Sequence, residues 1–375
     1  MVVAGDEVRR ARPSDGAALA LVEALSRPGV VDGFTVTGWH HRPVDTERAI
    51  DVDQSNESVV VSGPDGGAVV KWVVRSGDGH DPAPDRVSRL VDAGFDAMPR
   101  PWGLVQWQGE ARAELVAMVT ELVPGARDGW EWAVEDARAY PAGSAGLEQS
   151  ATEPARALGE IVARMHLGLA DDVPPRADAA RAAMWRDDAL AGLAEARALI
   201  DGAEGERLER HADSVRATLA SLGGAAGTPL VPVHGDLHVG QVLRGDDGAY
   251  RVTDFDGNPV VPGPERTALQ PAATDVAGMV QSLDHVAYVV LHRTPGVDAA
   301  AVERWRQEAT TIFLAAYRRT LAAAGRSALL DESLLEPLRL RQVCREYVYA
   351  GRHLPHWRYV PDRALRARYE VETDR

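Results

Sequence analysis

Five polar side chains stand in two short runs that are typical of phosphoryl-transfer enzymes. His234 and Asp236 directly follow an apolar run, and Gln241 comes five residues after Asp236. One hairpin turn later, Asp254 and Asp256 stand in an Asp-Phe-Asp-Gly run. Phosphoryl transfer needs a carboxylate beside the attacking hydroxyl and oxygen ligands for magnesium on the terminal phosphates. The two runs supply both kinds of group.

Each of these residues has a role on chemical grounds. Asp236 is the predicted catalytic base, which accepts or orients the proton of the attacking hydroxyl; its position matters more than its basicity because the transition state is loose. Gln241 and Asp254 are predicted to supply oxygen ligands to magnesium. Asp256 has two open roles, as a second metal ligand or as a cap of the following turn. His234 is expected to hold the loop by hydrogen bonds.

The same run allows a second metal chemistry. His234, Asp236 and His238 alternate, and alternating residues of a strand face one side, as a zinc hydrolase site would require. Gly235 and Gly240 bend the segment, however, and no third imidazole or Glu stands nearby in the sequence to complete such a site. The sequence therefore favours phosphoryl transfer.

Lys71 is the only lysine among the 41 basic residues counted as Lys and Arg. A coding bias toward arginine explains the scarcity of lysine but not the position of this one. Lys71 stands inside the apolar run Ala-Val-Val-Lys-Trp-Val-Val, where a charge is costly without an anionic partner. An ammonium on a flexible stem also differs in function from a planar guanidinium. We expect Lys71 to bind phosphate.

Composition narrows the class of protein. The 375 residues are enough for two lobes, and 45% apolar with 26% charged residues is ordinary for a globular chain. A net charge of −15 argues against nucleic acid or an anionic membrane as the main partner, since both select basic surfaces. The single cysteine, Cys344, excludes an intrachain disulfide and a thiolate zinc cluster. The sequence shows no signal-peptide core and no long apolar span, so we expect a cytoplasmic protein.

Hydrophobic periodicity divides the chain into a β-rich part and a helical part. Strands are expected near residues 33–37, 49–62, 68–74, 102–108 and 114–122, and helices at 15–25 and 85–93. Later helices are expected at 153–169, 178–202, 204–222, 274–291, 298–325 and 331–352, with a strand from Leu230 into the His234 run.

This order predicts an α+β fold with two lobes, like that of eukaryotic protein kinases. The N-terminal lobe would span residues 1–122, with a cap subdomain to about residue 50 and a nucleotide-binding sheet from about 51 to 122. The helical lobe, residues 123–375, would carry the catalytic loops and the acceptor site.

Taken together, the runs resemble the aminoglycoside phosphotransferase and choline kinase group of small-molecule kinases. Within that group they are most similar to the actinobacterial maltokinase-like branch. The resemblance rests on residues 53–59, 70–72, 120–130, 234–243, 254–257 and 275–279, in the order of the family. The loops at 234–243 and 254–257 indicate the broad group, and the run that ends in Asp-Gly-Trp at 128–130 narrows it to the branch.

The resemblance implies an ATP site and a Mg²⁺ cofactor. Lys71 would contact the nucleotide phosphates, and the backbone of Glu121, Leu122 and Val123 would hold the adenine. Asp236 would be the catalytic base.

Two departures from the family pattern are visible. Gln241 stands where the group usually has an Asn metal ligand, and its side chain is one methylene longer. The chain also lacks a glycine-rich phosphate loop, so Ser55 and Asn56 would have to cover the phosphates with side-chain donors.

The acceptor site is expected in the C-terminal part. Gln342, Arg345, Glu346 and Tyr349 share one helical face by their spacing, and Trp357 follows. One interpretation is a C-terminal helix that packs its aromatic residues into the core. The other is a sugar site, with Trp357 against a pyranose face and the polar residues bonded to hydroxyl groups.

The run from residue 342 to 362 resembles that of the glucosamine kinases in the branch, whereas the maltokinase pattern has Lys and Tyr in place of Gln342 and Arg345. Glu346 or Asp236 is a sensible partner for the ammonium of glucosamine, and His238 joins the predicted acceptor site. The expected activity is ATP-dependent formation of glucosamine 6-phosphate. Maltose 1-kinase and aminoglycoside phosphotransferase are the alternatives within the fold, and a nucleotide-binding pseudokinase is the non-enzyme alternative. The expected partners are ATP and a small sugar or aminosugar, bound by a monomer or a homodimer.

Overall fold

The computed structural model describes residues 2–4, 7–9, 13–50, 57–73, 81–109, 113–140, 145–259, 261 and 263–370. The chain forms two compact units. The sheet unit comprises residues 1–126 and 243–268, and the helical unit comprises residues 127–242 and 269–375. The segment with Asp254 and Asp256 thus belongs to the sheet unit, although it follows the catalytic loop in the sequence. The boundary that we predicted between an N-terminal lobe and a C-terminal lobe, at residues 122 and 123, stays a prediction.

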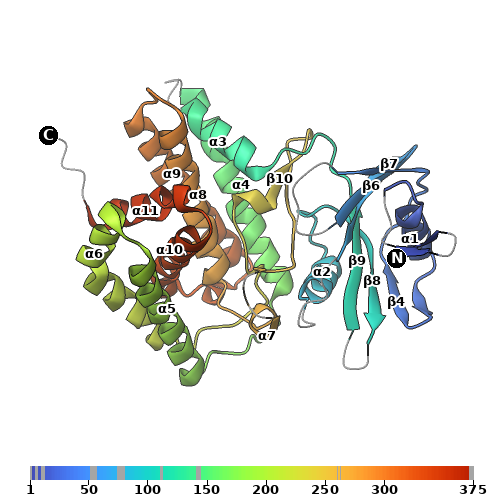
Figure 1. Ribbon diagram of the computed structural model, residues 1–375, viewed down its shortest axis with the longest axis horizontal. Helices are drawn as coiled ribbons and strands as arrows, with labels where there is room; N and C mark the ends of the chain where they lie inside the picture. The colour runs from blue at the N-terminus through green and yellow to red at the C-terminus, as the bar shows by residue number, and fades with distance from the viewer. Residues whose placement is uncertain are drawn as a thin grey trace. The chain divides into compact units, whose positions relative to one another are not determined.

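An antiparallel sheet of seven strands is the centre of the sheet unit (Figure 1). Its strand order is β3-β4-β8-β9-β7-β6-β5. The strands are β3 (Gly29–Val31), β4 (Phe34–Gly38), β5 (Thr46–Ala49), β6 (Glu57–Gly63), β7 (Gly66–Trp72), β8 (Pro101–Gln108) and β9 (Ala113–Glu121). Two short pairs complete the strands: β1 (Val2–Ala4) with β2 (Glu7–Arg9), and β10 (Val242–Arg244) with β11 (Tyr250–Val252). The helices of this unit are α1 (Ala17–Leu25), α2 (Ala83–Asp92) and α7 (Gly263–Arg266).

Helix α1 packs on one face of the sheet. Val59 and Val61 of β6 point to that face, as residues two apart on a strand must, and both are buried; Val60, on the opposite face, is buried as well. Val22 and Leu25, three apart on α1, pack in the same cluster, which also contains Val70 of β7. Burial of these side chains holds the strand that carries Lys71 in a fixed position.

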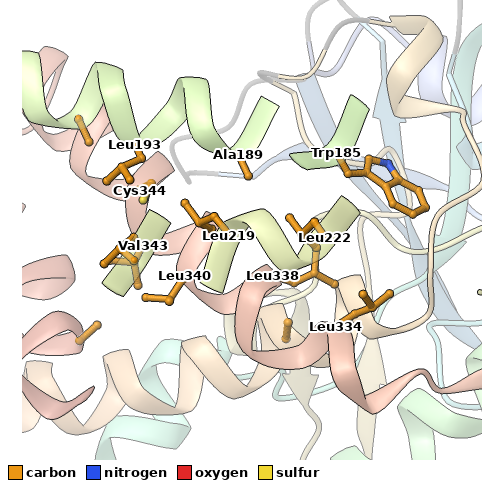
Figure 2. Close-up of a cluster of buried hydrophobic side chains, with 14 of the residues drawn as sticks. Trp185, Ala189, Leu193, Leu219, Leu222, Leu334, Leu338, Leu340, Val343 and Cys344 are labelled. Atoms are coloured by element: carbon orange, nitrogen blue, oxygen red, sulfur yellow. The ribbon is translucent and has the colours of Figure 1, made fainter. Parts of the chain in front are cut away.

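The helical unit packs its helices around a second core (Figure 2). Trp185 and Leu193 of α5, Leu219 of α6 and Val343 of α10 lie in this cluster. The helices are α3 (Gly129–Ala139), α4 (Ala145–Leu169), α5 (Ala179–Leu199), α6 (Gly202–Ala220), α8 (Ala273–Arg293), α9 (Ala299–Ala323), α10 (Leu335–Arg352) and α11 (Tyr359–Tyr369). Short 3-10 turns are η2 (Ser221–Gly224), η3 (Val239–Gln241), η4 (Ser327–Leu329), η5 (Glu332–Leu334) and η6 (Pro355–Trp357).

The predicted α+β fold, with a β-rich N-terminal part and a mostly helical C-terminal part, is confirmed. The strand predicted from Leu230 is wrong: Val231 makes only an isolated bridge with Gln270. Pro229 and Pro232 on either side of Val231 lack the N–H groups that a ladder needs. Helices α3 and α11 were not expected. Among the helices that the structure describes, none is both long and apolar enough to cross a membrane.

Candidate active site

Lys71 lies on β7, a strand paired on both sides. Its Cα partners are Ser58 on β6 and Met118 on β9. Its Nζ donates hydrogen bonds to Asp254 Oδ1 at 2.5 Å and to Asp256 Oδ2 at 2.7 Å. One ammonium therefore joins the two predicted carboxylates of the Asp-Phe-Asp-Gly run within the sheet unit.

The carboxylates determine the charge of this lysine. Burial alone lowers the pKa of Lys71, but the negative charges of Asp256 and Asp254 outweigh it, and the pKa is raised above its usual value. Asp254 has a φ of +64°, a left-handed conformation that Asp adopts more readily than most residues. Phe255 stands between the two acids in the sequence, and its carbonyl oxygen accepts a hydrogen bond from Nη1 of the buried Arg86 at 2.7 Å. Arg86 thus anchors the turn that presents both carboxylates.

A third acid, Asp81, joins this group and was missed by the sequence analysis. Its Oδ1 accepts a hydrogen bond from the backbone N–H of Ala83 at 2.9 Å, at the start of α2. Burial, followed by repulsion from Asp256, raises the pKa of Asp81 to about 6. An Asp shortly before a helix with proline in its first turn is a capping signal in the sequence. That signal predicts the turn, but it does not predict that Asp81 lies near Lys71 and Asp256.

In the helical unit, Asp275 holds the backbone of the predicted catalytic loop, residues 234–243. This residue of α8 is 1% exposed. Its Oδ2 accepts the N–H of His234 at 2.6 Å, and its Oδ1 accepts the N–H of Gly235 at 2.9 Å. One buried carboxylate thereby fixes the two peptide groups that precede Asp236.

Asp275 is itself held by a buried chain of side chains. His166 Nε2 lies 3.0 Å from Asp275 Oδ2, and His166 Nδ1 lies 2.7 Å from the hydroxyl of Tyr317. Burial tends to raise the pKa of Asp275, but the hydrogen bond and charge of His166 and the bonds from the loop hold that pKa below its usual value. The carboxyl group is therefore an anion that only accepts hydrogen bonds.

His238 closes the turn after Asp236. Its Nδ1 accepts the N–H of Gly240 at 3.1 Å, which caps η3, and His234 Nδ1 accepts the N–H of Asp236 at 3.4 Å. The Nδ1 atom of each imidazole thus accepts a hydrogen bond from its own loop. The structure shows no cluster of three His, Cys, Asp or Glu side chains placed to bind a metal among the residues it describes. The zinc hydrolase alternative finds no support here.

Trp130, at the start of α3, connects this loop to the predicted acceptor residues. Its ring stacks on that of His238, with centroids 6.0 Å apart, and on that of His285 of α8, at 6.5 Å. His285 Nε2 lies 3.0 Å from Glu346 Oε2, and Gln342 donates from Nε2 to Glu346 Oε1 at 3.2 Å. The structure thus brings His238, Gln342 and Glu346 into one connected group. His285 was missed because a lone histidine inside a helix carries no local signal.

Arg345 stands next to this group on α10. Burial and the nearby Arg341 lower the pKa of Arg345, while Asp236 and Glu346 act in the opposite direction. The remaining two predicted acceptor residues have different surroundings. Tyr349 is 48% exposed and its ring contacts that of His353. Trp357 packs against the helical core and meets the ring of Tyr359 edge-on at 5.6 Å.

The predicted adenine segment ends β9. The N–H of Glu121 donates to the carbonyl of Arg100 at 2.8 Å, and that of Leu122 to the carbonyl of Gly67 at 2.9 Å. These bonds fix the path of the backbone into Val123. Ser55 and Asn56, the predicted phosphate contacts, lie outside the residues that the structure describes.

Comparison with known proteins places the whole chain. No protein-family model matches it. Glucosamine kinase of Streptacidiphilus jiangxiensis is 50% identical over 368 residues, which are 96% of this chain and 82% of the relative. Glucosamine kinase of Mycolicibacterium smegmatis is 46% identical over 370 residues, 96% of this chain and 89% of the relative. The chain belongs to the glucosamine kinase family.

The structure agrees with this family. A solved glucosamine kinase in complex with glucosamine, ADP and inorganic phosphate matches with a TM-score of 0.88 and 48% identity, over 96% of this chain and 84% of that chain. A second crystal form of a glucosamine kinase matches with a TM-score of 0.87. The predicted resemblance is confirmed, and the chain is an enzyme of the phosphotransferase class.

Proposed function

We propose that the protein transfers the γ-phosphoryl group of ATP to the 6-hydroxyl of glucosamine and releases glucosamine 6-phosphate and ADP. The observation that carries this proposal is the match over 96% of the chain to a glucosamine kinase whose structure contains glucosamine, ADP and inorganic phosphate.

Asp236 acts as the base in the proposed reaction. The substrate oxygen bonds to the γ-phosphorus, the bond from that phosphorus to the bridging oxygen of ADP breaks, and the hydroxyl proton passes to the Asp236 carboxylate. Since the transition state is loose, the alignment of Asp236 contributes more than its basicity. The hydrogen bonds from the N–H groups of His234 and Gly235 to Asp275 would supply that alignment.

The nucleotide and Mg²⁺ would use the remaining catalytic residues. Asp254 and Asp256 converge on one cation, the Lys71 ammonium, and this arrangement of carboxylate oxygens also fits magnesium. We propose Asp254 and Gln241 as metal ligands, with Asp256 as a further one. When bound, Mg²⁺ neutralises charge on the phosphates. Lys71 then turns from the carboxylates to the phosphates of ATP, which carry more negative charge.

The adenine and phosphate contacts follow from the chain path. Glu121 and Leu122 use their N–H groups inside the sheet unit, so we propose the peptide groups around Val123 as the adenine contacts. Ser55 and Asn56 remain predicted contacts to the phosphates. A cytoplasmic location and a monomeric or homodimeric state also remain predictions.

The acceptor site is proposed at Gln342, Arg345 and Glu346, next to Asp236 and His238. The ammonium of glucosamine is a charge-assisted donor, and the carboxylate of Glu346 is its natural acceptor. Tyr349 and Trp357 remain predicted sugar contacts outside this connected group.

A coupled assay of ADP release tests the function. With ATP and Mg²⁺, we expect kcat/KM for glucosamine to exceed the values for maltose and glucose by at least about tenfold, because a neutral sugar offers no ammonium to the carboxylate of Glu346. An aminoglycoside, which does carry ammonium groups, is the third acceptor in the panel. Faster turnover of maltose would support a maltose 1-kinase, and faster turnover of an aminoglycoside would support the drug-modifying alternative.

Asp236→Asn tests the catalytic role. We expect kcat to fall by roughly 10²-fold or more, consistent with the loss of a general base, while ADP still binds. Asp213→Asn is the matched control, because the side chain of Asp213 is 96% exposed. A wild-type protein that binds ADP but turns over none of these acceptors would indicate a pseudokinase.

A further inference from the structure

His285 is a buried histidine whose role is not explained by packing alone. It lies in the middle of α8, and its side chain and that of Glu346 are each 11% exposed. Its Nε2 is close to two polar atoms at once: Glu346 Oε2 at 3.0 Å and an amide atom of Gln281 at 3.2 Å. One ring nitrogen thus serves two neighbours from two helices.

The chemistry of these atoms leaves two proton arrangements. If Nε2 carries a hydrogen, it donates to the carboxylate of Glu346, and the Gln281 amide must turn its oxygen toward the ring. If Nε2 has no hydrogen, it accepts from the Gln281 amide and cannot donate to Glu346. Only the first arrangement therefore makes His285 a hydrogen-bond donor to the carboxylate of Glu346.

The surroundings of His285 favour the first arrangement. Asp284 precedes it on α8, Glu346 and Arg339 face it from α10, and the ring of Trp130 stacks on it from α3. Burial lowers the pKa of His285, but Glu346 and Asp284 outweigh both burial and Arg339, and the pKa is raised. The acidic neighbours of His285 therefore favour a hydrogen on Nε2, donated to Glu346.

We propose that His285 is a positioning residue that holds Glu346 as an oriented anion and thereby sets the preference for an aminosugar over a neutral sugar. The inference rests on the proposed function, since it assumes that Glu346 accepts the substrate ammonium. Gln342 fixes Oε1 and His285 fixes Oε2, so the carboxylate can present its remaining lone pairs in one orientation. Orientation of this kind raises affinity because less rotational freedom is lost on binding.

The test uses two amide replacements that differ by one methylene. His285→Gln keeps an N–H donor at about the reach of Nε2, whereas His285→Asn has the same amide but is too short to reach Glu346. Steady-state kinetics with saturating ATP and Mg²⁺ would be measured for glucosamine and for glucose, and thermal melts with ADP would confirm that each variant folds and binds nucleotide.

We expect His285→Asn to raise KM for glucosamine about tenfold or more, with kcat changed by less than about threefold, which is the range for losing a bond to a charged group. Its ratio of kcat/KM for glucosamine to that for glucose should fall by a similar factor. His285→Gln should restore the ratio to within about threefold of the wild type.

Two results would overturn the proposal. In the first, His285→Asn leaves the ratio of kcat/KM for glucosamine to that for glucose unchanged, whether or not both values fall, which is the result of a purely structural role. In the second, His285→Gln is as impaired as His285→Asn. A wild-type enzyme without any preference for glucosamine would overturn the proposed function as well, so the wild-type ratio separates the two failures.

Discussion

Replacement of Asp275 by Asn tests whether the catalytic loop depends on one buried carboxylate. Asp275 accepts three hydrogen bonds, from the N–H groups of His234 and Gly235 and from His166 Nε2. Asn is nearly isosteric but has only one oxygen. If the side-chain oxygen of the introduced Asn takes the place of Oδ2, the NH₂ group takes the place of Oδ1 and faces the N–H of Gly235. Two hydrogen-bond donors then point at each other.

The magnitude follows from these bonds. An unsatisfied buried donor costs about 1–3 kcal/mol, and each of the two remaining bonds weakens by about 1 kcal/mol when its acceptor loses its charge. We therefore expect the free energy of unfolding to fall by about 3–5 kcal/mol. We also expect kcat to fall by roughly 10²-fold, since a shift of about 1 Å in Asp236 is enough for such a loss.

Urea unfolding measures the free energy of unfolding. ADP release at low temperature, where the variant stays folded, measures kcat. Asp362→Asn is the matched control. Asp362 is also buried, at 9% exposure, but it accepts from Arg207 at 2.8 Å rather than from the catalytic loop. We expect the control to lose stability and to keep its kcat.

The reasoning would be refuted by an Asp275→Asn enzyme that is as destabilised as expected yet keeps kcat within about threefold of the wild type. Such a result would mean that Asp236 is aligned by contacts other than its preceding peptides. A variant as stable as the wild type would refute the bond-by-bond estimate instead.

Three further predictions concern the loop and the pH dependence of stability. A Cβ on Gly240 would lie 2.6 Å from Trp130 Nε1, so Gly240→Ala should lower the free energy of unfolding by about 1–3 kcal/mol, measured with urea, and should lower kcat, measured by ADP release. Gly192→Ala is the control: its Cβ would meet open space, so the variant should be neutral or stabilising. The pKa of Asp275 is lower in the folded protein than its value of about 3.9 in the unfolded chain, so the ionised carboxylate stabilises the fold above that pH. This stabilisation is lost as the pH falls through the folded-state pKa. The unfolding midpoints of the wild type and Asp275→Asn should therefore converge only below about pH 4. The raised pKa of His285 acts on the opposite side: its contribution is complete below about pH 6.5 and is lost as pH rises through the folded pKa, so His285→Gln should remove that loss.

The broad fold and the candidate reactive groups could be predicted from the sequence. Asp236, Asp254 and Lys71 are proposed because each belongs to a short run whose residue types and spacing favour phosphoryl transfer. The sheet and most of the helices are readable because burial of one face imposes a period of 2 or 3.6 on the apolar residues. The strand expected from Leu230 fails because Pro229 and Pro232 remove backbone donors, a local feature that was visible in the sequence.

The tertiary structure decided which groups support the reactive ones. Lys71 pairs with Asp254 across 183 residues, Asp275 reaches His234 across 41 and His285 reaches Glu346 across 61. Such pairs leave no periodic trace, because a buried hydrogen bond depends on two elements meeting in space and not on the spacing within either one. The nature of the chemistry is therefore local in the sequence, whereas the alignment of Asp236 and the orientation of Glu346 depend on the packing of α8 against its neighbours.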